Sequence, residues 1–465
     1  MDWLVDSSTS PGKVRSVLII STLVSALAGF LFGYDNIVIS GAIGFLTKFF
    51  RLDPVGTGWA ASCALVGCLI GSATAGGIAD RFGLKKSLYL CAFCFTVSSF
   101  GVALAPNFTQ YVLWRIAGGF GIGAASIVAP MYIAEIAPRG IRGRLVVLYQ
   151  LGIVFGILAA VFINLLIQKS GDETWNLQRG WRWMFAVGVF PAVLFGAMIL
   201  LSKESPRWLL KIGRQREAQR VFAAINGEES ALAQVEAIHS FLEKEQGGIS
   251  ELFAGPFRRA LIVGLVLAAF SQMSGITSLL SFLPEVFKSA GQNVQDSFFQ
   301  SVLVGVVNVV FTGLAIWLVD QAGRKTLILA GTAMQAVALA SVGLLYYLHA
   351  GGTGILIGIV FFVAGHAVGN GAVCWVIISE IFPAKVRGTA MSIATTALWI
   401  SAYLANQFFP VMQKHLGSHG TFFFFSTMAV ANFVFVLARV PETKGYALEE
   451  ISQIWLKNPK KGLAA

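Results

Sequence analysis

Twelve long apolar runs constrain the fold of this chain more than any other feature of its sequence. Each run has about 20 residues or more, the length that an α-helix needs to cross the hydrocarbon core of a bilayer. Only 12% of the residues are charged, about half of the share found in a typical soluble domain. We therefore predict an all-α membrane protein with spans at 16–42, 57–79, 87–105, 109–134, 144–168, 182–202, 258–288, 297–319, 326–348, 354–381, 389–412 and 420–440.

Lys and Arg residues gather in alternate breaks between these spans. They follow the second, fourth, eighth and tenth spans, whereas the breaks at 106–109 and 350–353 contain neither residue type. Loops that stay in the cytoplasm carry an excess of Lys and Arg, so we expect a multi-pass protein of the plasma membrane with both termini in the cytoplasm. This topology accounts for the net charge of +11 without a nucleic-acid partner.

Three charged motifs near the ends of the spans recur in the same order roughly 240 residues later. The pairs are Asp80-x-x-Gly83-x-Lys85 with Asp320-x-x-Gly323-Arg324-Lys325, Glu135 to Arg142 with Glu380 to Arg387, and Glu204-Ser-Pro-Arg207 with Pro441-Glu442-Thr443-Lys444. Because the repeats keep the same sidedness, they indicate two six-helix halves related by parallel repetition. Transporters built in this way place the substrate site at mid-membrane between the halves.

The repeat divides the chain into five parts. We expect a cytoplasmic N-terminus (1–15), a first six-helix bundle (16–202), a linker (203–257), a second bundle (258–440) and a cytoplasmic tail (441–465). The linker is basic in its first half and acidic in its second, with apolar positions between the charges. This pattern favours short amphipathic helices at the cytoplasmic face, and a disordered linker is the alternative.

The repeated charges also have a mechanical interpretation. Carboxylates and basic groups at the cytoplasmic helix ends can form ion pairs within and between the bundles and latch the halves in one orientation. Simple positive-inside topology is the alternative, although carboxylates at fixed spacing favour a latch. Its candidate residues are Asp80, Arg81, Glu135, Arg142, Glu204, Arg207, Asp320, Arg324, Glu380, Arg387 and Glu442.

Asp35 is the only formal charge between Arg15 and Lys48, inside the first apolar run. A carboxylate inside a bilayer costs about 2.5 kcal/mol or more unless it faces a partner or a watery cavity. Asp35 lies seven residues before the outer end of its span, and Arg115 lies six residues after the outer start of the fourth. At 1.5 Å per residue the two side chains reach similar depth. We therefore predict that they pair, with a purely structural ion pair as the alternative.

These motifs together resemble the sugar porter family of the major facilitator superfamily. The matching residues run from about 29 to 445 and include Gly33-Tyr34-Asp35, Asp80-Arg81-x-Gly83, Arg115-x-x-Gly118-Gly119, Glu204-Ser205-Pro206-Arg207-Trp208 and Pro441-Glu442-Thr443-Lys444-Gly445. The resemblance implies twelve helices, alternating access by rocking of two bundles, and a monosaccharide-sized substrate. It also implies proton coupling, because proton-coupled members pair an Asp and an Arg at the positions of Asp35 and Arg115, and facilitative members typically carry Asn instead of the Asp.

The resemblance also implies a sugar site of aromatic and amide side chains. The matching positions are Phe32, Gln150, Gln272, Thr277, Asn308, Gly371, Trp375 and Trp399. The chain departs from the family at several of these places, and most of the changes shorten or remove a hydrogen-bonding side chain. Ser271-Gln272 replaces a Gln pair, Thr277 an Asn, Ser281-Phe282 a Tyr pair and Leu398 a polar residue, while Gly371-Ala372 replaces Gly-Pro. The pocket is therefore expected to be roomier or less polar than usual. His366 and Asn370 are candidate gate residues or extra ligands, with a structural hydrogen bond as the alternative for His366.

We accordingly expect a proton symporter that imports a monosaccharide or polyol. A facilitative uniporter, a porter of a non-sugar solute and a non-transporting sugar sensor are the alternatives. The expected partners are the sugar or polyol, protons and the lipid bilayer, with the chain acting as a monomer. No catalytic triad, metal cluster or phosphate loop is visible in the sequence, so we expect neither an enzyme nor a cofactor other than the coupling proton.

Overall fold

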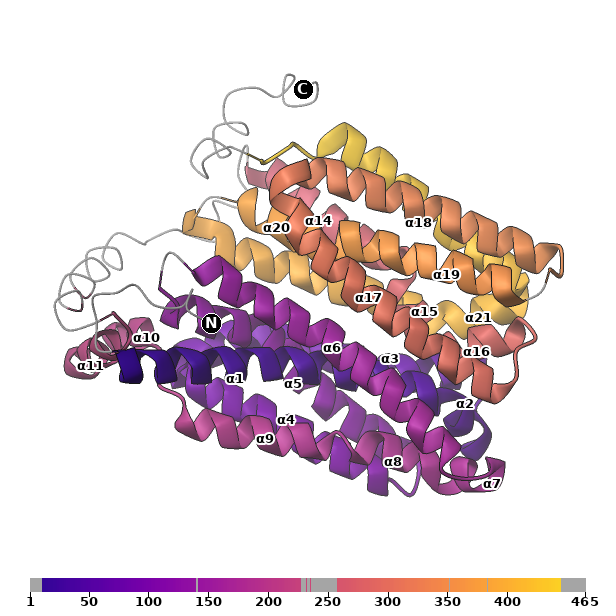
Figure 1. Cartoon of the computed structure of the whole chain (residues 1–465), viewed down its shortest axis with the longest axis horizontal. Coiled ribbons are helices and arrows are strands. Elements are labelled where there is room, and N and C mark those ends of the chain that lie inside the picture. Colours follow the sequence, from indigo (N-terminus) through magenta and orange to yellow (C-terminus); the bar gives the residue numbers. More distant parts are fainter. Residues whose placement is uncertain are drawn as a thin grey trace.

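The computed structural model describes residues 11–138, 141–226, 231, 235, 257–350, 352–382 and 384–444, and these residues form helices joined by short turns. Of the side chains in these ranges, those of 11–15, 142, 143, 226, 320 and 384–387 lie outside the description. Figure 1 shows the first half of the chain in indigo to magenta and the second half in orange to yellow, lying side by side.

The first half contains six spans and is followed by two short linker helices. Its helices are α1 (Pro11–Ile37), α2 (Ile39–Phe49), α3 (Pro54–Phe82), α4 (Leu84–Leu104), α5 (Phe108–Ile136), α6 (Arg142–Lys169), α7 (Glu173–Trp175), α8 (Trp181–Ala186) and α9 (Val189–Leu201), with a π-helical turn η2 (Asn176–Gly180) before α8. The described part of the linker forms α10 (Pro206–Lys211) and α11 (Gln215–Asn226). The apolar face of α11 is buried, as its amphipathic sequence predicts.

The second half follows the same plan. Its helices are α14 (Phe257–Met273), α15 (Ile276–Ser281), α16 (Leu283–Ser289), α17 (Val294–Ala322), α18 (Arg324–Tyr347), α19 (Gly352–His366), the π-helical turn η3 (Ala367–Gly371), α20 (Ala372–Glu380) and α21 (Ala384–Arg439). Within the described part of the chain, eleven helical stretches are long and apolar enough to cross a membrane, and the last of them covers 52 residues. Gly417 interrupts α21 with a non-helical backbone, so this stretch forms two spans. The predicted twelve-span fold is confirmed.

Four of the predicted spans are less regular than expected: the sixth divides into α8 and α9, the tenth contains η3, and the first and seventh are also interrupted. The first span is continuous in the prediction, but α1 ends at Ile37 and α2 begins at Ile39. The seventh span is divided by Gly275, whose φ of +83° is a left-handed conformation that only glycine adopts without strain. The prediction of one helix over 258–288 is therefore wrong in this detail, because apolar periodicity does not report backbone handedness.

Glycine contacts hold α3 and α5 together at backbone distance. A Cβ atom on Gly119 would lie 1.8 Å from the Ala64 carbonyl oxygen, and one on Gly123 would lie 2.0 Å from the Cys68 carbonyl oxygen. From the other side, a Cβ on Gly67 would lie 2.1 Å from the Ile116 carbonyl oxygen. Small residues allow membrane helices to pack where hydrophobicity gives no net attraction. The glycine run after Arg115 therefore serves helix packing, as its place inside a span predicts.

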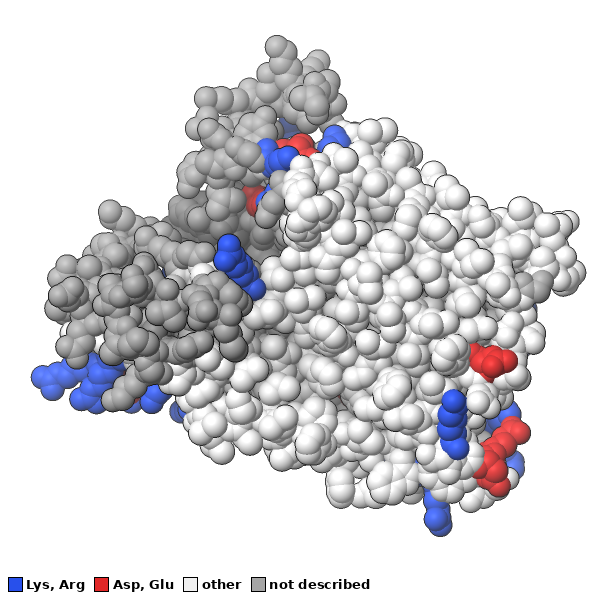
Figure 2. Space-filling view, viewed as in Figure 1, with Lys and Arg blue, Asp and Glu red and all other residues white. Residues whose placement is uncertain are grey.

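The surface matches a protein embedded in lipid. Figure 2 shows the visible Lys, Arg, Asp and Glu side chains in groups at the left and top and at the lower right, with an uncharged belt between them. Large apolar side chains face outward along this belt, including Phe93, Phe190 and Trp317. The end of the helices that carries Asp80, Arg81, Lys85, Arg324 and Lys325 is called the motif end below, and the other is called the opposite end.

Candidate functional site

Asp35 and Arg115 form a buried ion pair inside the first half. Arg115 Nη1 lies 3.1 Å from Asp35 Oδ2, and the two residues are 1% and 4% exposed, respectively. Among the described residues no other Asp or Glu is buried to this degree. The depth count from the sequence therefore predicted this contact correctly, although the contact alone does not define its role.

The guanidinium of Arg115 also binds the main chain of α1. Its Nη1 and Nη2 each donate to the carbonyl oxygen of Asp35 at 3.2 Å. Asp35 lies in the last turn of α1, where helix carbonyls lack an intrahelical partner. Arg115 thus stabilises the end of α1 and the carboxylate together, and the ring of Phe185 in α8 covers its guanidinium at 5.3 Å.

Two predicted sugar-site aromatics meet at the boundary between the halves. The rings of Phe32 in α1 and Trp399 in α21 lie 5.9 Å apart, at a tilt of 46°. Trp399 is buried, and its indole Nε1 has no hydrogen-bond partner. A buried N–H usually finds a partner, so this group is available to a polar ligand. Trp375 in α20 is partly buried and packs against the apolar core cluster that contains Trp399.

The amide candidates are distributed over both halves. The hydroxyl of Thr277 donates to Gln272 Oε1 at 2.6 Å, so these two predicted ligands contact each other across the break at Gly275. Gln150 lies in α6 and is partly buried, and Asn308 lies in α17 and is buried.

The η3 segment brings the other predicted polar residues together. His366 Nδ1 and Asn370 Nδ2 are buried without a hydrogen-bond partner. Asn370 Oδ1 accepts a bond from Asn432 Nδ2 of α21 at 3.4 Å. Gly371 lies against His366, where a Cβ would be 3.2 Å from its carbonyl oxygen. The π-helical turn ends at Gly371, and Ala372 follows it. The family has Gly-Pro at these two positions.

The motif-end carboxylates act alike in the two halves. Glu204 accepts the backbone N–H of Lys85 at 3.0 Å, and Glu442 accepts those of Arg324 and Lys325, each at 3.0 Å. Each carboxylate thus caps the N-terminus of a helix, α4 in one half and α18 in the other, where the helix dipole favours negative charge.

Other predicted latch residues also pair within one half. Asp80 lies 2.8 Å from Lys211, Arg324 lies 3.3 Å from Glu380, and Glu135 bonds the hydroxyl of Ser205. Arg81 contacts the ring of its neighbour Phe82, and Arg207 lies in α10. The side chains of Arg142, Asp320 and Arg387 lie outside the description. A latch between the halves stays a prediction.

The halves contact each other closely near the opposite end. Gln407 of α21 accepts a hydrogen bond from Ser62 at 2.8 Å and donates to the Val55 carbonyl at 3.0 Å, both on α3. A Cβ on Gly58 would lie 2.1 Å from the Gln407 carbonyl oxygen. By contrast, exposed Gly76 near the motif end of α3 has nothing near its Cβ position. The sequence reasoning missed Gln407, and the signal available was an adjacent amide pair, Asn406-Gln407, inside an apolar span.

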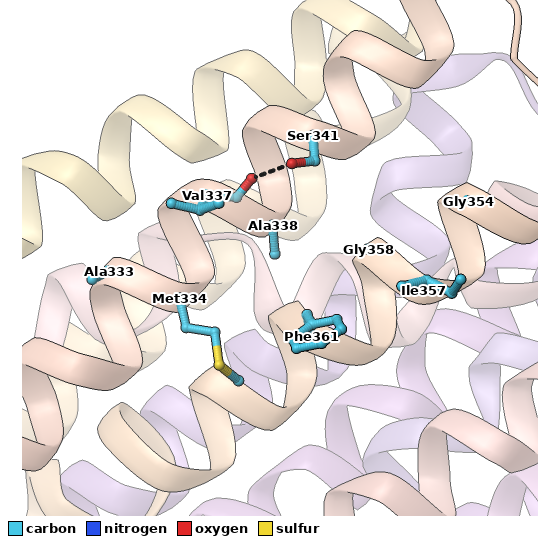
Figure 3. Close-up of a pocket in the computed structure, with 9 residues that line it drawn as sticks. All are labelled: Ala333, Met334, Val337, Ala338, Ser341, Gly354, Ile357, Gly358 and Phe361. Atoms are coloured by element: carbon cyan, nitrogen blue, oxygen red, sulfur yellow. Dashed lines mark hydrogen bonds between the residues drawn. The ribbon is translucent and has the colours of Figure 1, made fainter.

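A surface groove between α18 and α19 is separate from these residues (Figure 3). It has a volume of about 460 Å³ and contains none of the predicted site residues. Its one hydroxyl, Ser341, already donates to the Val337 carbonyl at 2.9 Å. The lining is Ala333, Met334, Val337, Ala338, Ser341, Gly354, Ile357, Gly358 and Phe361. The groove is apolar and offers no chemistry to a sugar. Among the described residues no group of three or more His, Cys, Asp or Glu side chains is placed to hold a metal ion.

Two six-helix halves with repeated motifs and a buried charge pair define a secondary transporter of the major facilitator type. The family model described as "Sugar (and other) transporter" matches residues 21–455. The chain belongs to this sugar porter family, whose members are membrane transporters and not enzymes.

Proteins with known roles resemble the chain over nearly its whole length. It is 40% identical to the arabinose-proton symporter of Bacillus subtilis, with 95% of each chain covered. It is 38% identical to the D-xylose-proton symporter of Escherichia coli, covering 95% of this chain and 96% of that one. A partially occluded inward-open structure of the xylose transporter XylE from E. coli matches with a TM-score of 0.84 and 36% identity, covering 93% of this chain and 100% of that one.

Proposed function

We propose that the protein imports a monosaccharide or a polyol by proton symport, with Asp35 as the proton-binding group and Arg115 as its partner. The observation that carries the proposal is the buried contact between these two side chains at 3.1 Å. A facilitator has no need of a titratable group at this depth, where a charge is costly. The arabinose- and xylose-proton symporters among the relatives support the same conclusion.

The geometry suggests how a proton can be taken up without disordering the site. An Arg side chain stays protonated in proteins, so the carboxylate of Asp35 is the member of the pair that is free to accept a proton. Protonation of Asp35 weakens the contact with Oδ2, whereas the two bonds to the Asp35 carbonyl do not depend on the carboxylate charge. Arg115 therefore stays in place, and rocking of the halves can expose Asp35 first to one side of the membrane and then to the other.

The contacts between the halves assign a state to the structure. The halves touch at the opposite end through Ser62, Gln407 and Val55, while glycines near the motif end, Gly76 and Gly388, have no close neighbours. We place the motif end in the cytoplasm because the helix ends and loops there carry an excess of Lys and Arg over the opposite end. Both termini then lie in the cytoplasm, and the structure represents an inward-facing state, in keeping with its likeness to an inward-open transporter. The bundles 16–202 and 258–440 are the proposed moving bodies.

The sugar is proposed to bind between Phe32, Trp375 and Trp399, with hydroxyls directed to the amides of Gln150, Gln272 and Asn308. Aromatic faces suit the C–H side of a sugar ring, and a few convergent polar groups fix its orientation. Gly371 leaves room beside the ring, and His366 and Asn370 offer additional polar groups. All of these residues come from one chain, so we expect a monomer to be sufficient for transport, with lipid as its surroundings and no cofactor beyond the proton.

The proposal is tested by Asp35→Asn in proteoliposomes with arabinose and xylose as the first labelled sugars. Asn keeps the shape of Asp and can still accept from Arg115, so the protein should fold. Uphill uptake driven by a pH gradient should fall to the level of empty liposomes. Sugar counterflow without a gradient should persist within about threefold of the wild type.

Two outcomes would contradict parts of this proposal. Uphill uptake that survives in Asp35→Asn would exclude Asp35 as the coupling group. A wild-type protein that exchanges sugar but never accumulates it would instead favour the facilitative alternative. An exposed carboxylate variant, Glu173→Gln, is the control, because Glu173 pairs with Lys48 at the surface and should not affect coupling.

A further inference from the structure

The hydroxyl of Ser98 in α4 is buried beside the ion pair and has no hydrogen-bond partner. Ser98 is 1% exposed, and its Oγ is unpaired. Leaving a buried hydroxyl unpaired costs about 1–3 kcal/mol, so such a group calls for an explanation. Many Ser and Thr hydroxyls in membrane helices donate to a carbonyl of their own helix. Thr96, two residues earlier, does so at 2.8 Å. Ser98 makes no such bond.

Gly118 of α5 brings this hydroxyl and the Asp35 carboxylate to one small space. A Cβ on Gly118 would lie 2.3 Å from Ser98 Oγ and 3.3 Å from Asp35 Oδ2. The two oxygens are therefore at most 5.6 Å apart on either side of the space. One water molecule with ordinary hydrogen bonds of about 2.8 Å bridges such a distance. Gly118 thus keeps open the path between them.

Arg115, the partner of Asp35, has a second unpaired polar atom. Its Nη1 and Nη2 bind Asp35, but its buried Nε has no partner. Buried water normally occupies sites where several such groups meet. A hydroxyl can donate to a carboxylate and accept from a protonated acid, because it carries one donor and two lone pairs. Ser98 is therefore chemically suited to both charge states of Asp35.

We propose that Ser98 is a positioning residue for the coupling proton, which acts on Asp35 through a bridging water beside Gly118. The hydroxyl dipole stabilises the charged carboxylate when the proton has left, and so it sets the external pH at which uptake is half-maximal. This inference rests on the proposed role of Asp35. It adds a third helix, α4, to the pairing of α1 and α5.

The test compares Ser98→Ala, Ser98→Thr and Ser99→Ala in proteoliposomes. Loss of the hydroxyl in Ser98→Ala removes a hydrogen bond to a charged group, which is worth about 1.5 kcal/mol or more. The external pH for half-maximal uphill uptake should rise by about one unit, while counterflow exchange changes less than twofold. Ser98→Thr keeps the hydroxyl and should retain the wild-type pH profile. Ser99→Ala, in which the neighbouring buried hydroxyl is lost, should also retain it.

The outcomes separate this inference from the proposed function. If Ser98→Ala has the wild-type pH profile while Asp35→Asn abolishes uphill uptake, only the role of Ser98 is overturned. An equal shift in Ser98→Ala and Ser98→Thr would reduce the effect to packing and also overturn it. If Ser98→Ala fails to fold, Gly118→Ala provides the second measurement, because its methyl group would lie 2.3 Å from Ser98 Oγ and displace the hydroxyl from its place beside Asp35. Its pH midpoint should rise too, and Gly121→Ala, which meets Cys94 instead, is its control.

Discussion

Trp399 carries the sharpest prediction for a single side chain in the proposed sugar site. Its Nε1 is buried and unpaired, and its ring packs on Phe32 of the other half. Trp399→Phe keeps an aromatic six-membered ring and removes the N–H donor together with the rest of the pyrrole ring. If Nε1 donates to a sugar hydroxyl, the loss of about 1 kcal/mol should raise the KM for counterflow about fivefold with little change in the maximal rate.

Trp317→Phe is the matched control for this measurement. Trp317 is 61% exposed on the outer surface of α17, so the same chemical change should leave the KM unaltered. An unaltered KM in Trp399→Phe as well would remove its indole from the list of sugar ligands.

At the ion pair of Asp35 and Arg115, some contacts could be predicted from the sequence and others could not. The contact of Asp35 with Arg115 could be predicted because a lone charge in an apolar span needs a partner at equal depth. The bonds from Arg115 to the Asp35 carbonyl could not be predicted, because they require α1 to end at Ile37. No Pro or Gly at that point of the sequence indicates a helix end. Ser98 was missed for a related reason, because a serine in an apolar helix usually bonds its own backbone.

At the scale of elements, the contact of α3 with α5 depends on glycines that carry no side chain. Gly119→Ala would place a methyl group 1.8 Å from the Ala64 carbonyl oxygen, and a rigid helix backbone cannot yield as a side chain would. We expect a loss of about 1–3 kcal/mol in stability. The thermal unfolding temperature of the detergent-purified protein should fall by several degrees.

Gly76→Ala, in the partner helix α3, provides the comparison. Beyond the adjacent backbone of its own helix, no atom lies within 4 Å of the added methyl group, so its unfolding temperature should stay at or slightly above that of the wild type. Equal effects from the two substitutions would mean that general helix flexibility, and not the close approach of α3 and α5, sets the stability.

The helices themselves were largely predictable, whereas of their interruptions the sequence indicated only the one in the glycine-rich segment Gly365 to Gly371. Hydropathy gave twelve spans because lipid requires a long apolar run of each, and the polar break at Gly417 separated the last two. The turn at Gly275 and the π-helical turn η3 depend on local backbone geometry, which any of the chain's 50 glycines could adopt. Nothing in the sequence around Gly275 distinguishes it from a glycine in a regular helix.

At the scale of the whole molecule, Gln407 contributes to closing the opposite end. Gln407→Leu removes its bonds to Ser62 and to the Val55 carbonyl, which are absent once the halves separate there. A loss of about 1–2 kcal/mol should shift the population toward the outward-open state about tenfold. Spin labels at exposed Lys48 and Lys414, one in each half, should report a larger share of long distances.

Gln413→Leu controls for the chemistry of this substitution. Gln413 also lies in α21, but it accepts a bond from Ser418 of its own half, so the distance distribution should not change. A wild-type distribution in Gln407→Leu would mean that apolar contacts alone close this end.

If Asp35 is the proton carrier, as proposed, its solitary burial sets a thermodynamic ceiling on what such a transporter can accumulate. One carboxylate carries one proton per cycle, and no second Asp or Glu among the described residues is buried beside the path. The free energy spent on each sugar is then that of a single proton crossing the membrane. Every tenfold of accumulation requires about 59 mV of proton-motive force. A cell that uses this protein therefore takes up scarce sugar at low energetic cost, but its internal sugar level follows its membrane energisation directly.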